Sequence, residues 1–451
     1  MVKLATVILA AGKGTRMKSE LPKVLHQVCG KSMVEHIIST AQNLNPVQNV
    51  AVIGHKGELV EEELEDINID FAYQNQQLGT GHAVMQAEEL LSDFTGSVLV
   101  LCGDTPLLTA ETLELLTKSQ QEKSAAATIL TTKVDDPTGY GRIVRGQKGE
   151  VVKIVEDKDA TVKQAEINEV NTGTYCFDSQ LLFSALDELD TDNAQGEYYL
   201  TDIIEIFKNQ GNKVTAVITK DEAETLGVNN RRHLAKAEEV LRKRICNRHL
   251  DFGVTIIDPK NTFIDDEVEI GQDTIIYPFA MLEGDTKIGE CSTIGPQSRI
   301  IDSELGSEVE VQNSVIKEAK VGDKTMVGPF AYLRPGAEIG SEAKVGDFVE
   351  IKKSKVGDKS KVPHLSYIGD TIIGQGVNIG AGTITANYDG EAKHQTVIKD
   401  GVFIGSNSTL VAPIHIGQNA ITGAGSVVTK DVEESTLVLG VPAIEKESEG
   451  D

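Results

Sequence analysis

Residues 321–346 read VGDKTMVGPFAYLRPGAEIGSEAKVG, and they contain an aliphatic residue followed by glycine four times. The four aliphatic residues, Val321, Val327, Ile339 and Val345, are separated by 6, 12 and 6 positions. A helix would need spacings near 3.6 and a simple strand spacings near 2, whereas a six-residue period is the signature of a parallel β-helix. Each six-residue unit of such a coil forms one flat face and turns its aliphatic side chain inward.

The same pair recurs throughout the region from about Phe252 to Thr436. Its aliphatic members are Ile270, Ile288, Ile294, Leu305, Val321, Val327, Ile339, Val345, Val356, Ile368, Ile373, Ile379, Ile404 and Ile416. We therefore predict a β-helix here, with flat faces and open ends that favour self-association. The 25-residue gap between Ile379 and Ile404 breaks the period and predicts a protruding loop at 386–395. Such a loop is a favoured place for function.

The first 228 residues have a different pattern, in which short apolar runs alternate with amphipathic segments. Residues 4–10, 50–53 and 97–101 have the length and composition of buried strands, and residues 32–43 have helical spacing. This alternation is typical of a mostly parallel sheet covered by helices on both faces. We predict an α/β domain.

At about 150 residues per domain, a chain of 451 residues is expected to hold two or three domains. Residues 229–250 have apolar residues at helical spacing among many charges, which fits either a connecting helix or the last helix of the first domain. We divide the chain into a first domain at 1–228, a linker helix at 229–250 and a β-helix domain at 251–451.

The composition limits the possible partners. Lys and Arg total 43 against 69 Asp and Glu, which gives a net charge of -26. Such a surface repels phosphate backbones and anionic lipid, so we expect no nucleic-acid or membrane partner. The apolar run at 4–11 is too short to span a bilayer, and no cleavable signal follows it. Five cysteines without a CxxC indicate reduced thiols and a cytoplasmic protein.

A glycine-rich turn, LAAGKGTRM (9–17), follows the first predicted strand, and LPK (21–23) comes soon after it. Glycines let a backbone approach a phosphate closely, and Lys13, Arg16 and Lys23 add local positive charge. The turn matches neither the dinucleotide fingerprint nor the GxxxxGK[ST] loop, and a tight strand-to-helix turn is the alternative interpretation. The three cations favour phosphate handling.

Further motifs identify a family. They are Gln74 with QLGTGHA (77–83), GDTPL (103–107), TGYGR (138–142), NTG (171–173), GVNNR (227–231), VEIKK (349–353), PHLSYIGD (363–370), NIGAGT (378–383) and NYDG (387–390). With the glycine-rich turn, the first half resembles nucleotidyltransferases that make nucleoside-diphosphate sugars. Over nearly its whole length, the chain resembles the bifunctional bacterial N-acetylglucosamine-1-phosphate uridylyltransferases and glucosamine-1-phosphate acetyltransferases.

The resemblance implies a Rossmann-like mixed sheet followed by a left-handed β-helix. It also implies that glucosamine 1-phosphate is acetylated by acetyl-CoA, and that the resulting N-acetylglucosamine 1-phosphate then reacts with UTP. The products are UDP-N-acetylglucosamine and pyrophosphate. Mg²⁺ is the implied cofactor, and the implied assembly is a homotrimer through the β-helix, with acetyltransferase sites between adjacent subunits.

The first site follows from the resemblance. Asp104 and Asn229 are expected to hold Mg²⁺, since both supply hard oxygen ligands. Arg16 and Lys23 are expected to steady the phosphates, with Lys23 facing the charge that develops at the α-phosphoryl group. The remaining nucleotide-binding and sugar-binding residues are Leu9, Ala10, Ala11, Gly12, Gln74, Gly79, Thr80, Gly141, Glu156 and Asn171. Taken alone, Asp104 could cap a turn and Asn229 a helix; Asp192 and Glu197 are left outside the site.

The second site centres on His364. An imidazole titrating near neutrality suits removal of a proton from an attacking amine, and the resemblance makes His364 the general base. Glu350 is expected to orient it. The residues expected to bind the sugar phosphate are Arg334, Lys352, Tyr367, Asn378, Asn387, Tyr388 and Lys393. The residues expected to line the acetyl-CoA slot are Ala381, Asn387, Tyr388, Ser406 and Ala424, although small-residue packing alone would also explain Ser406 and Ala424.

The chain departs from the family at Gly440, where related enzymes carry an arginine for the CoA phosphates. A short acidic tail, EKESEGD (445–451), follows. Lys430 is one candidate for the missing contact. Two alternatives remain: a sugar nucleotidyltransferase whose β-helix serves only assembly or regulation, and a catalytically dead scaffold. The presence of His364 and of Lys23 argues against them.

Overall fold

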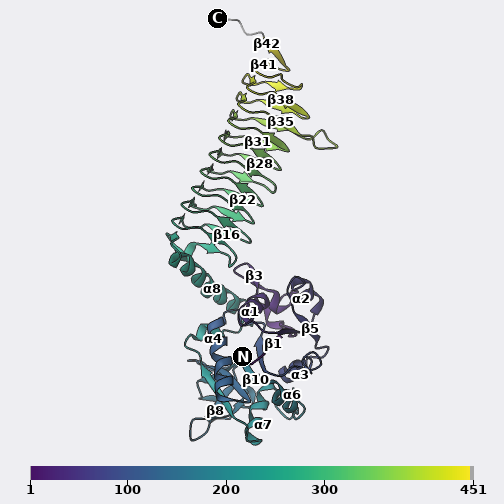
Figure 1. Cartoon of the computed structure of the whole chain (residues 1–451), viewed down its shortest axis with the longest axis vertical. Helices are drawn as coiled ribbons and strands as arrows, with labels where there is room; N and C mark the ends of the chain where they lie inside the picture. Colours follow the sequence, from purple (N-terminus) through teal and green to yellow (C-terminus); the bar gives the residue numbers. More distant parts are fainter. Residues whose placement is uncertain (1, 447–451) are drawn as a thin grey trace. The chain divides into compact units, whose positions relative to one another are not determined.

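The computed structural model describes residues 2–446, so residues 447–451 of the acidic tail lie outside the described residues. The chain forms two compact units, Met1–Leu241 and Arg242–Asp451, which are described separately. Figure 1 shows the α/β elements of the first and the coil of the second.

The first unit is built on a nine-stranded mixed sheet, whose main order is β11-β7-β10-β6-β1-β4-β5. Its strands are β1 (Leu4–Leu9), β4 (Gln48–Ile53), β5 (Asp70–Tyr73), β6 (Ser97–Cys102), β7 (Ala127–Lys133), β10 (Glu169–Asp178), β11 (Val214–Ile218), β8 (Arg142–Arg145) and β9 (Val151–Val155), beside a hairpin of β2 (Gln27–Val28) and β3 (Lys31–Ser32). Strands β4, β1 and β6 run parallel, and β10 runs antiparallel to β6 and β7. The predicted strands at 4–10, 50–53 and 97–101 are confirmed.

Helices cover the sheet. They are α1 (Met33–Gln42), α2 (Gly57–Glu63), α3 (Thr80–Met85), α4 (Ala110–Lys123), α5 (Val162–Ala165), α6 (Ser179–Leu186) and α7 (Ile203–Asn209), with short 3-10 turns η1 (Thr15–Met17), η2 (Lys23–Leu25), η3 (Asp157–Asp159), η4 (Leu200–Asp202) and η5 (Glu222–Thr225). The predicted helix at 32–43 begins where Ser32 and Glu35 form a capping box, which satisfies two free N–H groups of the first turn. It ends after Gln42.

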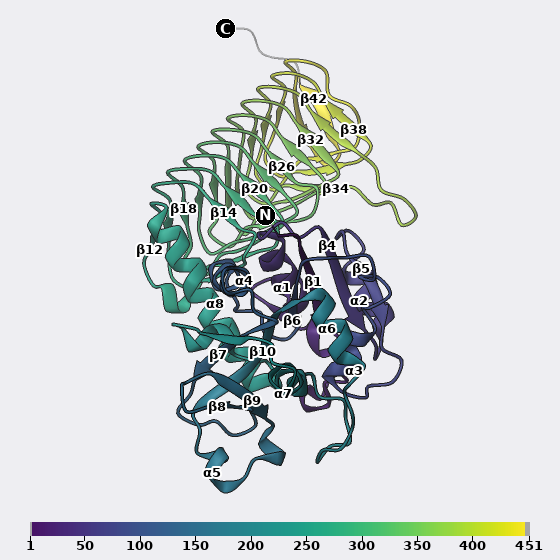
Figure 2. The same cartoon turned by 60° about the horizontal axis from the view of Figure 1, so that its bottom comes forward.

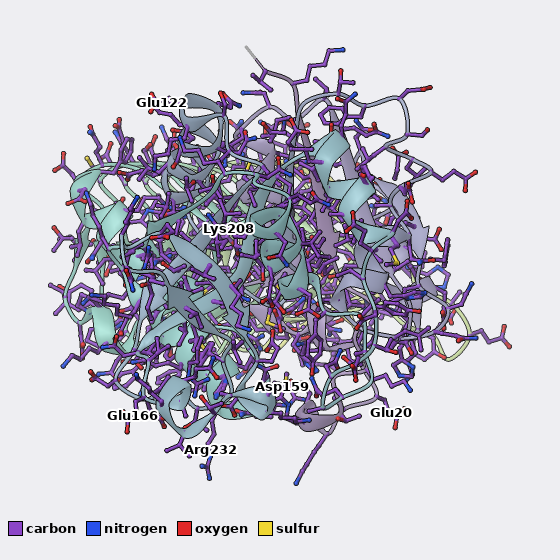
Figure 3. All side chains as sticks on the ribbon, turned by 90° about the horizontal axis from the view of Figure 1, so that it is seen from below. Glu20, Glu122, Asp159, Glu166, Lys208 and Arg232 are labelled. Atoms are coloured by element: carbon purple, nitrogen blue, oxygen red, sulfur yellow. The ribbon has the colours of Figure 1, made fainter. Side chains whose placement is uncertain are left out.

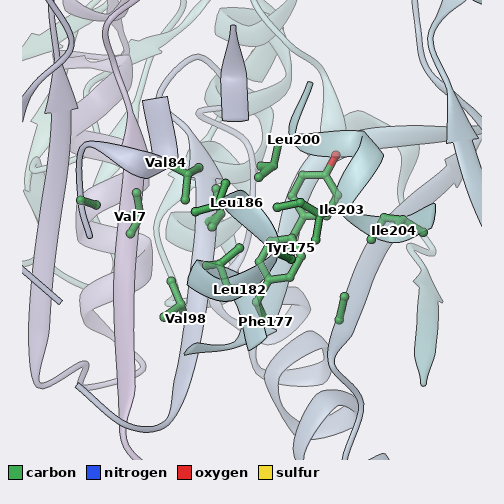
Figure 4. Close-up of a cluster of buried hydrophobic side chains, with 14 of the residues drawn as sticks. Val7, Val84, Val98, Tyr175, Phe177, Leu182, Leu186, Leu200, Ile203 and Ile204 are labelled. Carbon is green, nitrogen blue, oxygen red and sulfur yellow. The ribbon is translucent and has the colours of Figure 1, made fainter. Parts of the chain in front are cut away.

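Buried side chains fill both faces of the sheet. Because successive residues of a strand point to opposite faces, Val7 of β1 belongs to one cluster and Ile8 to the other. The first cluster packs Val7 and Val98 against helices α6 and α7 around Phe177 (Figure 4). The second cluster packs Ile8 against α1 and α4. The predicted covering of both faces is confirmed.

A long helix, α8 (Arg231–Asp251), covers most of the segment for which a linker helix is predicted. The border between the two compact units falls within it, after Leu241. The three-part division into 1–228, 229–250 and 251–451 stays a prediction.

The second unit is a left-handed parallel β-helix of three sheets, which we number I, II and III in chain order. Sheet I contains β12 (Thr255–Ile256), β15 (Ile275–Ile276), β18 (Thr293–Ile294), β21 (Glu310–Val311), β24 (Met326–Val327), β27 (Lys344–Asp347), β30 (Lys361–His364), β33 (Asn378–Ile379), β36 (Phe403–Ile404), β39 (Ile421–Thr422), β41 (Leu437–Gly440) and an antiparallel end strand, β42 (Ala443–Lys446).

Sheet II contains β13 (Phe263–Ile264), β16 (Met281–Glu283), β19 (Arg299–Ile301), β22 (Val315–Lys317), β25 (Tyr332–Leu333), β28 (Glu350–Lys352), β31 (Tyr367–Gly369), β34 (Ile384–Ala386), β37 (Thr409–Val411) and β40 (Val427–Val428). Sheet III contains β14 (Glu269–Ile270), β17 (Lys287–Ile288), β20 (Glu304–Leu305), β23 (Lys320–Val321), β26 (Glu338–Ile339), β29 (Lys355–Val356), β32 (Thr371–Ile373), β35 (Thr396–Ile398) and β38 (Ile414–Ile416). A 3-10 turn, η6 (Pro259–Asn261), lies in the first coil.

The six-residue period is explained by burial inside the coil. All fourteen of the aliphatic residues named for the repeat are at most 5% exposed. Burying one such side chain contributes about 1.5–3 kcal/mol. Stacked coils therefore share one continuous aliphatic core, enclosed by the three sheets whose stacked strands Figure 2 shows. Between β34 and β35 the chain leaves the coil, and the loop projects as the broken period predicts (Figure 1).

Charged side chains lie at the surface of the first unit. Glu20, Glu122, Glu166 and Arg232 lie at the periphery of the first unit in Figure 3, and all four are exposed. The five cysteines form no disulfide. Among the described residues, no helix is both long enough and apolar enough to cross a membrane.

Candidate functional sites

The first candidate site begins at the carboxyl end of β1. The carbonyl of Leu9 accepts from the Gly103 N–H (3.0 Å), and the Ala10 N–H donates to the Val52 carbonyl (2.8 Å). These bonds fix the start of the glycine-rich turn beside the ends of β4 and β6. A Cβ built on Gly12 would meet no heavy atom within 4 Å, so space is open beside this backbone.

Gly14 controls how closely this turn approaches Lys23. Its φ is +59°, a conformation that glycine adopts without penalty, and a Cβ there would lie 2.6 Å from the Lys23 Cβ. Lys23 is the first residue of η2. The glycine therefore lets the two backbone segments LAAGKGTRM and LPK pack against each other.

Four predicted residues meet at this place. The Lys23 ammonium donates to Asp104 Oδ2 and lies 3.4 Å from Asn229 Oδ1. The Arg16 guanidinium donates to the same Asn229 oxygen (2.8 Å). The Val228 N–H donates to the Asp104 carbonyl (2.8 Å), which ties the loop of Asn229 to the end of β6.

The oxygen atoms of Asp104 and Asn229 fit Mg²⁺ chemically. Both are hard ligands, and the Lys23 ammonium already binds between them, so the place attracts a cation. Among the described residues, no group of three or more His, Cys, Asp or Glu side chains could hold a metal. A magnesium ion here would therefore complete its shell with water and substrate phosphates, as Mg²⁺ commonly does.

The residues predicted to read the base lie in one loop that hydrogen bonds hold in place. The buried Gln74 amide donates to the Gly79 carbonyl (3.0 Å), and Thr80 Oγ1 accepts from the Leu200 N–H (3.2 Å). Gly79 has a φ of +116°, and a Cβ on it would lie 2.5 Å from the Tyr198 carbonyl oxygen. The segment around Tyr198 thus supports the loop.

The predicted sugar residues also lie together. A Cβ on Gly141 would lie 3.4 Å from the Asn171 Cβ and 3.5 Å from Glu156 Oε1. Glu156 Oε1 accepts from the Thr201 hydroxyl (3.1 Å), and burial raises the pKa of the Glu156 carboxyl. Asn171 donates to the Tyr175 hydroxyl (2.7 Å). The sequence analysis did not include Thr201 and Tyr175, which no motif marks.

The second candidate site lies along the corner between sheets I and II. His364 ends β30 in register with Asp347 of β27. The next coils continue this column: the Gly382 N–H donates to the His364 carbonyl (3.3 Å), the Asn407 N–H to Ala381 (2.7 Å) and the Gly425 N–H to Ser406 (2.7 Å). The small residues predicted for the acetyl-CoA slot, Ala381, Ser406 and Ala424, therefore extend in one line from His364.

The carboxylate that holds His364 differs from the predicted one. The His364 Nδ1 lies 2.5 Å from Asp347 Oδ1, whereas Glu350 accepts from the Arg334 guanidinium at 2.7 Å. Within one chain the parallel register places Asp347, and not Glu350, directly beside His364, and the role of Glu350 as the orienting residue stays a prediction. The bond from His364 lowers the pKa of the Asp347 carboxyl. Half of the His364 side chain is exposed (51%), so solvent reaches the imidazole.

The residues predicted to bind the phosphate, Arg334, Lys352 and Lys393, lie at the opposite edge of sheet II, where its strands end. The neighbouring Lys393 ammonium is the main cause that lowers the pKa of Lys352, and Arg334 adds to the effect. Three cations in one place suit a phosphate, which a net charge of -26 would otherwise repel. Lys352 is the last residue of β28, and Lys393 lies on the projecting loop.

The other predicted residues lie at different places along the coil. Asn387 is buried, and its side-chain amide donates to Asp370 Oδ2 (2.5 Å). A Cβ on Gly369 would lie 2.7 Å from the Asn387 side-chain nitrogen and 2.5 Å from the Tyr367 hydroxyl, so Gly369 lets these two side chains approach the backbone. Tyr388 pairs with Lys393 across the loop and is exposed. Asn378 begins β33 on sheet I. Lys430 follows the end of β40 on sheet II, so within one chain it is not at the corner of Ala424.

Two families match the chain. The nucleotidyl transferase family matches residues 5–238, and the bacterial transferase hexapeptide family, a model of six repeats, matches 267–302, 318–353 and 395–430.

The curated relatives include three named "Bifunctional protein GlmU". That of Heliobacterium modesticaldum is 53% identical over 439 residues, covering 97% of this chain and 96% of its own. That of Brevibacillus brevis is 51% identical and covers 97% of this chain and 95% of its own. That of Geobacillus thermodenitrificans is 52% identical and covers 98% of this chain and 96% of its own. A solved structure of UDP-glucose pyrophosphorylase with UDP-glucose covers 54% of this chain and 100% of its own, at 20% identity and a TM-score of 0.44.

Proposed function

The chain belongs to the family of bifunctional GlmU proteins, and on that premise we propose how its two sites divide the synthesis of UDP-N-acetylglucosamine. It is a bifunctional enzyme, a nucleotidyltransferase and an acetyltransferase, with the first activity in the α/β unit and the second in the β-helix. The observation that carries the proposal is the meeting of Arg16, Lys23, Asp104 and Asn229 at the glycine-rich turn.

In the first site, an oxygen of N-acetylglucosamine 1-phosphate attacks the α-phosphorus of UTP, and pyrophosphate leaves. The chain aligns the reactants and neutralises charge, since phosphoryl-type transfer requires little covalent help. Lys23 is proposed to stabilise the negative charge on the α-phosphoryl oxygens. Arg16 is proposed to bind the leaving phosphates. Asp104 and Asn229 would hold Mg²⁺, which supplies further charge neutralisation when bound.

The first site also selects its substrates. Gln74, Gly79 and Thr80 are proposed to read the uracil, with Leu9 to Gly12 along the nucleotide. Gly141, Glu156 and Asn171 are proposed to hold the amino sugar; a Cβ at Gly141 would lie 2.9 Å from the Ile154 side chain and would crowd this place.

In the second site, the amine of glucosamine 1-phosphate attacks the thioester carbonyl of acetyl-CoA. His364 accepts the proton from the nitrogen, the C–N bond forms, the C–S bond breaks, and the proton passes to the departing thiolate. Asp347 keeps the imidazole oriented by its bond to Nδ1, which leaves Nε2 for the amine. Arg334, Lys352 and Lys393 bind the sugar phosphate, with Tyr367, Asn378, Asn387 and Tyr388 around the sugar and the acetyl group.

The role of Asp347 is separable from that of Glu350. We expect Asp347→Asn to lower acetyl transfer about 10-fold, since it removes a charge-assisted hydrogen bond. The matched change Glu350→Gln should instead raise KM for glucosamine 1-phosphate, because it frees Arg334. Steady-state kinetics of CoA release measure both kcat and KM and so distinguish the effects of the two variants. A loss of kcat confined to Glu350→Gln would restore Glu350 as the orienting residue.

A homotrimer through the β-helix is also proposed. Phe279, Phe330, Phe348 and Leu365 lie along the corner between sheets I and II, each more than half exposed. The rings of Phe330 and Phe348 stack at 5.3 Å. Exposed apolar columns of this kind mark interfaces, and this one continues from His364.

Two further observations favour copies of the same chain as the partners. The outward face of sheet III is neutralised by its own ion pairs, such as Lys320–Glu304 (2.9 Å) and Lys355–Glu338 (2.8 Å). Within one chain, His364 lies at one edge of sheet II, whereas Lys352 ends a strand at the other edge. A second copy at the corner of His364 could bring its cation cluster to the imidazole.

The double change Phe330→Glu and Phe348→Glu should convert the trimer to monomers and lower acetyl transfer, because two charges would be buried in the interface. Light scattering should give three times 48.6 kDa for the unchanged chain and 48.6 kDa for the variant. Lys320→Glu on sheet III is the matched control. A variant that stays trimeric would place the interface elsewhere.

The function as a whole is tested by incubating glucosamine 1-phosphate, acetyl-CoA, UTP and Mg²⁺ with the protein and identifying the products by mass. UDP-N-acetylglucosamine should form, and omission of acetyl-CoA should abolish it. A nucleotide sugar formed without acetyl-CoA would contradict the proposed order. Because both co-substrates are cytosolic metabolites and the five cysteines form no disulfide among themselves, we propose that the protein is cytoplasmic.

A further inference from the structure

His26 lies next to the first site but has no part in the chemistry above. It directly follows η2, three residues after Lys23, and its side chain is 5% exposed. Its backbone N–H donates to the Lys23 carbonyl (3.3 Å), and its carbonyl accepts from the Met33 N–H (3.1 Å). His26 is thus fixed relative to the Lys23 turn and to the start of α1.

The His26 side chain is bonded to the loop of Asn229. Its Nδ1 lies 3.1 Å from Arg231 Nη1. A guanidinium can only donate, so Nδ1 is the acceptor and the ring proton is on Nε2. Burial, and then the charge of Arg231, lower the pKa of His26, which agrees with a neutral acceptor.

The other ring nitrogen argues against a packing role. Nε2 of His26 is buried and has no hydrogen-bond partner among the described residues. A buried N–H without a partner is costly, and an apolar ring would fill the same space without that cost. The histidine is therefore explained by the acceptor that it offers to Arg231.

The bond joins the two segments that form the cation site. Lys23 and His26 lie on one segment, and Asn229 and Arg231 on the other. The second segment is rigid at its end, because Asn230 Oδ1 accepts from the N–H groups of Arg232 and His233 (2.9 Å each). A shift of Arg231 would therefore move Asn229 relative to Lys23.

We propose that His26 is a positioning residue: through Arg231 it sets the distance between Lys23 and Asn229, and so the affinity of the uridylyl site for its divalent cation. The proposal rests on the proposed function of this site. Residues outside a metal's own ligands commonly change its affinity 10-fold to 100-fold, because they orient the ligands.

Two substitutions at His26 separate positioning from packing. His26→Phe keeps the ring and removes the acceptor, whereas His26→Asn keeps an acceptor near the position of Nδ1 and removes most of the ring. We measure binding of Mn²⁺ in the presence of UTP by the paramagnetic resonance signal of the free ion. Positioning predicts about 10-fold to 100-fold weaker binding for His26→Phe and nearly unchanged binding for His26→Asn. The opposite order would show a packing role and overturn the proposal.

A second set of variants tests the same bond from the side of Arg231, in case a substitution at His26 impairs folding. Arg231→Met should weaken Mn²⁺ binding as much as His26→Phe, and the double variant should be no weaker than either, because one bond is removed in each case. Additive losses would overturn the proposal. The unchanged chain must form UDP-N-acetylglucosamine in the same preparation; if it does not, the proposed function fails rather than the role of His26. Acetyl transfer by the β-helix checks that each variant remains intact.

Discussion

Replacing His364 with alanine should lower the rate of acetyl transfer by about 10²–10⁴, the range over which a positioned general base contributes. Without an imidazole beside the nitrogen, the amine must lose its proton to water while it attacks the thioester. Uridylyl transfer from supplied N-acetylglucosamine 1-phosphate should not change, because that reaction uses residues of the other unit. Thiol release from acetyl-CoA measures the first reaction, and pyrophosphate release measures the second.

His415 offers a matched control for this change. It lies on β38 in sheet III, is exposed, and has a carboxylate neighbour, since its Nδ1 is 3.7 Å from Asp431. His415→Ala should retain full acetyl transfer, and added imidazole should restore part of the activity of His364→Ala. An equal loss in both variants would point to damage of the coil. Full activity of His364→Ala would remove the general-base role, whereas equal inactivity of the unchanged chain and the variant would favour a β-helix that serves only assembly.

Replacing Lys23 with methionine should lower uridylyl transfer by about 10²–10³, as expected when one preorganised charge is removed from a transition state. Methionine keeps much of the length and the apolar stem of lysine. It removes the ammonium that bonds Asp104 and faces Asn229, so the two oxygens lose their bridging cation. The effect should fall on kcat more than on KM for UTP, because the charge to be stabilised develops during the reaction.

The control for this change is Lys18→Met, which removes an exposed lysine of the same turn that takes no part in the proposed site. Its uridylyl transfer should match that of the unchanged chain, and both variants should keep acetyl transfer. Chelation of Mg²⁺ should abolish uridylyl transfer in each protein. A Lys23→Met enzyme with an unchanged kcat would exclude Lys23 from the transition state and leave it as a structural partner of Asp104.

The β-helix was predictable because its period is written directly in the chain. Val321, Val327 and Ile339 recur at multiples of six, and each is buried where the coil turns its side chain inward. The strands of the first unit were predictable for a similar reason, since a strand buried on both faces is apolar throughout. The antiparallel β10 was less so, because direction leaves little trace in a run such as TYCF (174–177).

The carboxylate of the same chain that lies beside His364 was not foreseen from the sequence. Glu350 and Tyr367 are 17 residues apart and lie in register, and so do Asp347 and His364. The residue one coil before the histidine was therefore the signal that could have identified Asp347. Glu350 was favoured because it belongs to a motif, although its position places it beside Tyr332 and Arg334 instead.

The period of the coil, the alternation of the first unit and the residue types of the two sites could be predicted from the chain, because each of these depends on neighbours along it. The contacts between distant groups were fixed only by folding: Lys23 on Asp104 across 81 positions, Arg231 on His26 across 205, and Asp347 on His364 in the next coil. Such contacts depend on strand register and on the meeting of distant loops, which are fixed when the whole core packs rather than by any local preference.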